Sequence, residues 1–248
     1  MRGRGLAGWH RVGPSLDAYC ERIDASFWSE PVNALSNGGF LAAAALAFLQ
    51  WRRARSSDRP AICLIIIVAT VGVGSFLFHT FANRWSRLAD VLPIAGFIYG
   101  YFFLAMRRYL RLSLAAAGAA TFAFAGFSFG FERAWVLAFA RRGLELTNYS
   151  VGYFPAALAL LGVGATLVTL PPAVAPRAAA GRALLLAGGL FVVSLVFRTL
   201  DQAVCADWPL GTHFIWHGLN AVVLFVLVSA AIPEPLSTAK GWRSGAFC

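Results

Sequence analysis

The sequence has little charge. Only 13% of its 248 residues are Asp, Glu, Lys or Arg, whereas 59% are hydrophobic. The mean hydropathy of +0.67 is far above that of a soluble globular domain. This composition excludes a soluble domain and is typical of a protein that crosses a membrane several times.

Lysine is almost absent, because Lys240, near the C-terminus, is the only one in the chain. It lies beyond the last apolar run, so no predicted helix carries the Schiff-base lysine of a retinal protein. The formal net charge is nevertheless +10. The basic residues lie mainly in tails and loops rather than on one amphipathic face, and we therefore expect no nucleic acid partner.

Cysteine is also scarce. Four cysteines are too few for a disulfide scaffold, although Cys20 and Cys205 both lie beside polar motifs. Residues 1–15 lack the apolar core of a signal peptide.

Long apolar runs dominate the rest of the chain. Because a helix needs about 20 apolar residues to span a membrane, the runs predict seven transmembrane helices, at residues 33–51, 61–80, 90–106, 112–130, 151–170, 183–199 and 213–232. The sequence thus predicts an all-α, seven-helix membrane domain over residues 17–232, between an N-terminal tail (1–16) and a C-terminal tail (233–248). Residues 131–150 are expected to form an amphipathic segment at the membrane surface.

Polar residues gather at particular ends of these helices. Each helix crosses the membrane once. Every even-numbered helix therefore ends, and every odd-numbered helix begins, on the side of the membrane where the N-terminus lies. That face receives the acids before the first helix and Ser75, His79, Asp90, Arg198, Asp201, His213 and His217. One polar site explains all of these residues together, whichever way the protein is inserted.

The orientation of the chain is less strongly indicated. Basic residues divide almost evenly between the two sides, whereas nine of the eleven acidic residues lie on the side of the N-terminus. Acidic residues contribute little to orientation. We expect the N-terminus and the polar site on the extracytoplasmic side and the C-terminus in the cytoplasm.

Three of the four histidines lie at the edges of apolar runs. His213 and His217 are four residues apart and so share one helix face, and the third is His79. A histidine pair at this spacing plus one distant histidine suits zinc with three protein ligands and an open fourth position. The alternative is that each ring packs at the interface and binds a neighbouring carbonyl.

Ionisable residues at the mouth of a membrane bundle indicate a functional site. Asp90 begins the third predicted helix after a ten-residue loop, and its alternative role is to cap that helix or to pair with Arg84 or Arg87. Arg198 and Asp201, three residues apart, are expected to form a structural ion pair.

Acidic residues crowd the segment before the first helix: Asp17, Glu21, Asp24 and Glu30. Hard oxygen ligands at this density suit calcium. The spacing is not that of an EF-hand loop, so a solvated acidic cap is the alternative.

At these residues the chain resembles the alkaline ceramidase family, seven-helix zinc amidases of a superfamily that includes the adiponectin- and progestin-type receptors. The resemblance covers essentially the whole chain. The motifs that carry it are YCE (residues 19–21), Glu30-Pro-Val-Asn33 with Ser36-Asn37, GSFLFH (74–79) with Asp90, and HFIWH (213–217).

The resemblance assigns roles to individual residues. It implies zinc ligands at His79, His213 and His217, with Ser75 and Asp90 as catalytic residues. It also implies a calcium site matched by Glu21, Glu30 and the carbonyl of Tyr19, while Asp17 and Asp24 each lie one place from the family's positions. Cys20 and Cys205 match the family's cysteine pair, and we expect them to form a disulfide, with reduced thiols as the alternative.

The implied activity is zinc-dependent hydrolysis of the amide bond in an N-acyl sphingoid lipid such as ceramide. The products would be a long-chain base and a fatty acid, and the membrane lipid substrate would not leave the bilayer. A zinc-containing receptor or lipid sensor of the same superfamily is the alternative. The YCE and EPxN motifs favour the enzyme.

Overall fold

The computed structural model describes residues 10–12, 15–169 and 175–233. Within these residues, seven helical segments are long and apolar enough to cross a membrane. Their elements are α1 (Pro31–Ser36) with α2 (Gly38–Arg53), α3 (Arg59–Phe81), α4 (Arg84–Arg108), α5 (Leu114–Leu146), η1 (Ser150–Tyr153) with α6 (Phe154–Thr169), α7 (Ala175–Leu200) and α8 (His213–Ala231). The predicted all-α bundle of a multi-pass membrane protein is confirmed.

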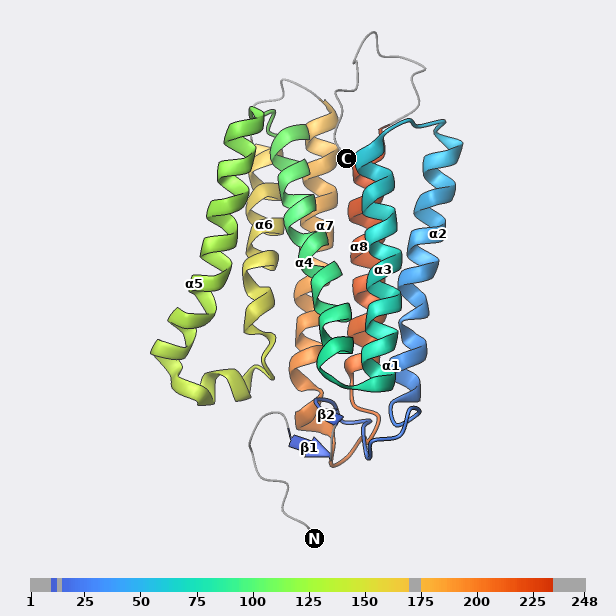
Figure 1. The fold of residues 1–248 in the computed structure, drawn as a ribbon. Helices are drawn as coiled ribbons and strands as arrows, with labels where there is room; N and C mark the ends of the chain where they lie inside the picture. Colours follow the sequence, from blue (N-terminus) through green and yellow to red (C-terminus); the bar gives the residue numbers. More distant parts are fainter. Residues whose placement is uncertain (1–9, 13–14, 170–174, 234–248) are drawn as a thin grey trace.

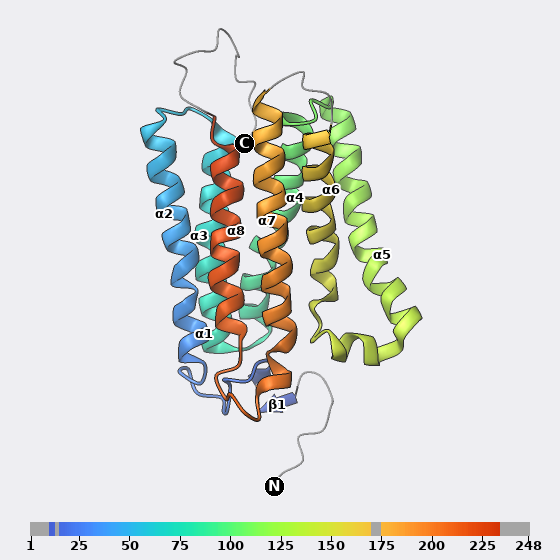
Figure 2. The ribbon, with the colours of Figure 1, turned by 180° about the vertical axis from the view of Figure 1, so that it is seen from behind.

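The helices stand side by side in one bundle (Figure 1). The last helix, α8, packs against α2, α3 and α7, and α4 packs against α3 and α5. Seen from behind, α8 lies between α2 and α7 (Figure 2). Side chains at the start of α8 can therefore meet side chains from the start of the chain and from α3.

One end of the bundle, the lower end in Figure 1, carries the chain segments that precede α1. Strands β1 (His10–Val12) and β2 (Ser15–Asp17) pair there in an antiparallel hairpin. The short helix η2 (Gln202–Val204) follows α7 at the same end. We call this the site end, because the polar residues predicted to share one membrane face are found here.

The turn between α3 and α4 is shorter than predicted. Ala82 adopts a left-handed conformation with φ of 44° and ends α3, and Asn83 then begins α4 through a capping box with Ser86. The expected ten-residue loop was wrong, because the polar residues after Phe81 form the first turns of α4. Asp90 consequently lies inside α4 rather than at its start.

Helix α5 also departs from the prediction. It continues without a break through residues 131–139 and changes direction at Ala140, whose φ of 53° is not helical. Below this point the helix runs sideways toward η1 (Figure 1). The sideways segment therefore begins about nine residues later than the hydropathy indicated, because Phe131, Trp135 and Phe139 continue the apolar stripe of the spanning helix.

Candidate metal centre and active site

Three histidines from two helices meet at the site end. His79 lies in the last turn of α3, and His213 and His217 lie in the first two turns of α8. One ring nitrogen from each lies within 4.8 Å of the others, and all three side chains are buried. The spacing-based prediction of a shared cluster corresponds to this group, which is close enough to hold one metal ion.

Two of the rings are oriented by hydrogen bonds. Nδ1 of His79 lies 2.6 Å from Oε2 of Glu30, and Nδ1 of His217 lies 2.7 Å from Oγ of Ser36. These bonds leave Nε2 of both rings for a metal. Nδ1 of His213 is buried and has no hydrogen-bond partner in the described part of the chain.

This donor set fits zinc. Three neutral imidazoles are a known zinc ligand set when the fourth position is open to water or substrate. Metal-binding histidines usually give their other ring nitrogen to a carboxylate, a carbonyl or water, and Glu30 provides such a contact. An orphaned polar nitrogen inside a protein is rare, and His213 would gain a partner by binding a metal through its ring.

Tyr19 covers the histidines. Its ring stacks on His213 with a centroid distance of 3.7 Å and an angle of 22°, and its centroid lies 5.1 Å from that of His79. Burial raises the pKa of the Tyr19 phenol, which therefore remains neutral. The sequence pointed only to the carbonyl of Tyr19, whereas the structure places its side chain against the histidine cluster.

Asp201 fastens the start of α8. Its carboxylate accepts hydrogen bonds from the backbone N–H groups of Cys20 (3.1 Å), Thr212 (2.7 Å) and His213 (2.9 Å). A carboxylate is stabilised at a helix N-terminus, where N–H groups lack intrahelical partners. Asp201 thereby fixes the backbone that carries His213.

The expected ion pair between Arg198 and Asp201 was wrong. Asp201 accepts from backbone N–H groups at the start of α8, whereas Arg198 faces the loop before α6. Arg198 donates to the carbonyl of Asn148 (2.7 Å) and to Oγ of Ser150 (3.2 Å). Its guanidinium also lies 5.3 Å from the centre of the Tyr153 ring.

Ser75 and Asp90 lie beside the histidine cluster. Ser75 is buried one turn before His79, and it is close enough to Asp90 to interact with its carboxylate. Oδ1 of Asp90 is buried and has no hydrogen-bond partner among the described residues. The cap of α4 is Asn83, which replaces the capping role considered for Asp90.

Gly74 makes this proximity possible. A Cβ atom on Gly74 would lie 2.0 Å from the carbonyl oxygen of Ala89 and 3.2 Å from the backbone nitrogen of Asp90. Helices α3 and α4 can approach so closely only because residue 74 has no side chain. The contact places Ser75 and Asp90 side by side.

The acidic residues before α1 accept hydrogen bonds from other parts of the protein. Glu21 accepts hydrogen bonds from the N–H groups of Val32 (2.7 Å) and Asn33 (2.8 Å) at the start of α1, and burial raises the pKa of its carboxyl group. Asp24 is exposed and accepts from the N–H (2.9 Å) and Oγ (2.6 Å) of Ser26.

Glu30, one of the predicted calcium ligands, also has partners within the protein. Glu30 forms an ion pair with Arg22, a buried residue that the sequence did not single out. Within the described residues, the His79, His213 and His217 group is the one close enough to share a metal, and it includes none of the predicted calcium ligands. The side chain of Asp17 lies outside the described part. The described carboxylates of this segment therefore already have hydrogen-bond donors within the protein.

Cys20 and Cys205 are joined as a disulfide in the structure, with their Cα atoms 5.3 Å apart. The bond links the segment before α1 to the segment after α7. Gly211, with φ of 63°, passes this junction so closely that a Cβ atom there would lie 2.7 Å from Cβ of Cys20. The first residues of the domain are thus held against the start of α8.

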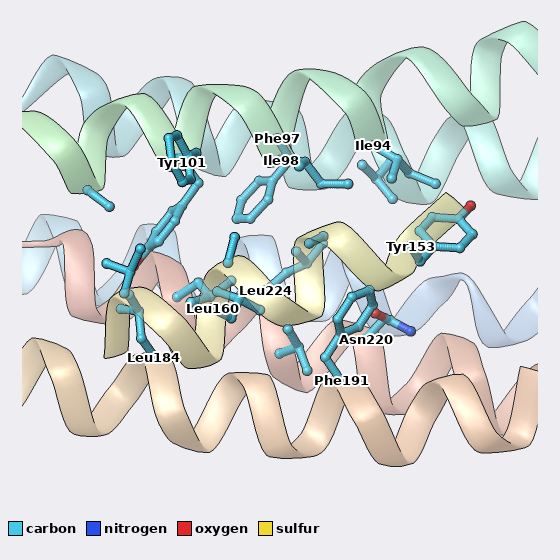
Figure 3. A pocket seen from close by; sticks show the side chains of 18 of the residues that line it. Ile94, Phe97, Ile98, Tyr101, Tyr153, Leu160, Leu184, Phe191, Asn220 and Leu224 are labelled. Atoms are coloured by element: carbon cyan, nitrogen blue, oxygen red, sulfur yellow. The ribbon is translucent and has the colours of Figure 1, made fainter. Parts of the chain in front are cut away.

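An apolar cavity with about 100 Å³ of free space lies inside the bundle. One end of the cavity lies next to the histidines. Trp216, the residue before His217, lines it, and the centroid of the Phe40 ring in its wall lies 6.2 Å from that of the His217 ring. From Tyr153 and Asn220 it runs along the helices toward Tyr101 and Leu184 (Figure 3). The cavity gives an apolar chain a place beside the histidine cluster.

Comparison with curated proteins gave no match. The family model described as Ceramidase matches residues 15–231, which include α1 to α8 and every histidine of the cluster. This chain belongs to the ceramidase family.

Proposed function

We propose that the protein is a zinc-dependent hydrolase that cleaves the amide bond of an N-acyl sphingoid lipid. The observation that carries this proposal is the buried cluster of His79, His213 and His217 at the mouth of an apolar cavity inside the bundle. Membership of the ceramidase family supports ceramide hydrolysis in general. The products are a long-chain base and a fatty acid.

The three histidines would hold the zinc ion, which when bound polarises water and the amide carbonyl. Oδ1 of Asp90 has no hydrogen-bond partner among the described residues, and it is the atom that accepts a proton from the attacking water and returns one to the leaving amine. Ser75, on the same helix face as His79, donates its hydroxyl hydrogen to the oxyanion that develops on the amide.

The cavity binds the hydrocarbon part of the substrate. Its lining is almost wholly apolar, as in most small-molecule sites. Because the cavity lies within a membrane bundle, the substrate reaches it without leaving the bilayer. The sphingoid headgroup then lies toward the site end, where the polar residues are.

We place the N-terminus and the active site on the extracytoplasmic side and the C-terminus in the cytoplasm. The disulfide between Cys20 and Cys205 at the site end supports this orientation, because such bonds persist mainly in oxidising compartments.

The proposal is tested by incubating purified protein in detergent micelles with an N-acyl sphingoid lipid and measuring both products by mass spectrometry. An enzyme releases base and fatty acid in equal amounts over many turnovers, and His217→Ala does not. A receptor of the same fold binds the lipid without releasing products, so saturable binding without turnover contradicts the proposal.

A further inference from the structure

Arg22 is a buried arginine in the segment between β2 and α1, and its side chain has no exposed surface. All three of its nitrogen atoms donate hydrogen bonds. Nε donates to Oε1 of Glu30, one terminal nitrogen donates to the carbonyl of His79 (2.7 Å), and the other donates to the carbonyl of Asp24 (3.2 Å). The guanidinium thus joins oxygen atoms from three separate points of the chain.

Glu30 connects this guanidinium to the histidine cluster. Its second oxygen, Oε2, lies 2.6 Å from Nδ1 of His79 and accepts a hydrogen bond from Nδ2 of Asn33 at 3.2 Å. Arg22 therefore holds His79 twice, at its backbone carbonyl and, through Glu30, at its ring. Partners of this kind fix the tautomer and the orientation of metal-binding imidazoles.

Two of the oxygen atoms that Arg22 binds, from Glu30 and Asp24, belong to the segment in which a calcium site was expected. Calcium takes about six to eight oxygen ligands, but Glu30 and the carbonyl of Asp24 already bind the guanidinium. Glu21 is occupied by the N–H groups of Val32 and Asn33. A divalent cation at this position would also meet a fixed positive charge in a medium of low dielectric constant, where like charges repel strongly.

We propose that the Arg22 guanidinium replaces a calcium ion in this chain and positions His79 for its metal through Glu30. It is a permanent cation, so the segment before α1 folds and functions without calcium. Arg22 is a positioning residue, since it contacts His79 and Glu30 but no reacting atom. The inference rests on the proposed metal site at His79 and not on the identity of the lipid.

The first arm of the test uses the unaltered protein. Zinc-loaded protein in detergent micelles is titrated with ⁴⁵Ca²⁺, and its thermal unfolding is recorded with added calcium and with magnesium as the control ion. We expect no stoichiometric calcium binding and the same unfolding temperature in both salts. Saturable binding of calcium with a rise in unfolding temperature that magnesium does not produce overturns the proposal, whether or not the protein cleaves lipid.

The second arm measures zinc affinity by competition with a chromophoric chelator. Arg22→Gln removes the charge. We expect zinc affinity to fall by about 10–100-fold, the usual effect of removing a residue that supports a metal ligand through hydrogen bonds. Arg22→Lys keeps the charge and should recover part of the loss. Arg84→Gln, an exposed arginine at the same end of the bundle, is the matched control and should bind zinc as tightly as the unaltered protein.

Wild-type zinc affinity in Arg22→Gln overturns the positioning role. If Arg22→Gln does not fold, the zinc affinity of Arg22→Lys is measured in its place, because an ammonium group cannot bind Glu30 and two carbonyls in the geometry of the guanidinium. An Arg22→Lys protein with unaltered zinc affinity then contradicts the proposal, and a weakened affinity supports it.

Discussion

Oε2 of Glu30 lies 2.6 Å from Nδ1 of His79, and the two side chains are only 2% and 1% exposed. The carboxylate therefore holds the imidazole in one orientation. Glu30→Gln keeps the size of the side chain but removes its charge, and we expect zinc to bind about 10–100-fold more weakly. Competition with a chelator measures this affinity.

Glu21→Gln is the matched control for this change. Glu21 is a buried glutamate of the same segment whose hydrogen bonds go to the backbone of Val32 and Asn33. It should retain the zinc affinity of the unaltered protein. Equal losses in the two variants would mean that negative charge in this segment, rather than the contact with His79, supports the metal.

Asp90→Asn is expected to separate metal binding from catalysis. Zinc should remain bound, because Asp90 is not one of the three ligands, while turnover should fall by about 100-fold or more, the scale on which general-base catalysis contributes. Metal analysis and product release from the same preparation measure both properties. Asp207→Asn alters an exposed carboxylate and is the control. Near-normal turnover in Asp90→Asn would remove Asp90 from the mechanism.

Much of this architecture can be predicted from the sequence. A membrane core requires about 20 apolar residues per helix, so hydropathy located all seven spans. Counting the helices in order then placed His79, His213 and His217 on the same side of the membrane, because successive helices must begin on opposite sides.

Contacts made by loops and side chains could not be predicted in this way. The Arg22, Glu30 and His79 network depends on how the segment before α1 folds back, and no periodicity encodes that path. The spacing of Arg198 and Asp201 predicted a pair, but Asp201 binds the start of α8 and Arg198 binds the carbonyl of Asn148 instead. The short turn before α4 did carry a signal, the Asn83 and Ser86 capping box, which hydropathy cannot detect.

Gly74→Ala should push α3 and α4 apart. The added Cβ would lie 2.0 Å from the Ala89 carbonyl oxygen, and overpacking of this kind costs about 1–3 kcal/mol. We expect a lower unfolding temperature and reduced turnover, because Asp90 moves away from Ser75.

Gly96→Ala, in α4, is the matched control, since a Cβ atom there meets nothing within 4 Å. It should leave stability unchanged or raise it slightly, because alanine favours helix more than glycine does. If the two variants unfold at the same temperature, the close contact at Gly74 is not a determinant of the fold.

Removal of the disulfide should destabilise the site end. The bond closes a loop with a sequence separation of 185 residues, for which the chain-entropy model gives a ceiling of about 5 kcal/mol. Cys205→Ser should therefore lower the unfolding temperature under non-reducing conditions. Mass spectrometry of unreduced, alkylated protein checks the bond itself, and free alkylated Cys20 and Cys205 in active protein would contradict both the bond and the proposed extracytoplasmic orientation.

The most direct test of the proposed zinc hydrolase is metal removal followed by titration with zinc, with release of fatty acid from an N-acyl sphingoid lipid as the measurement. Metal-free protein should release none, and activity should return in proportion to bound zinc up to about one ion per chain, as expected for a site with three histidine ligands. His217→Ala should neither bind zinc nor recover activity. Full hydrolysis by protein that contains no zinc would contradict the account.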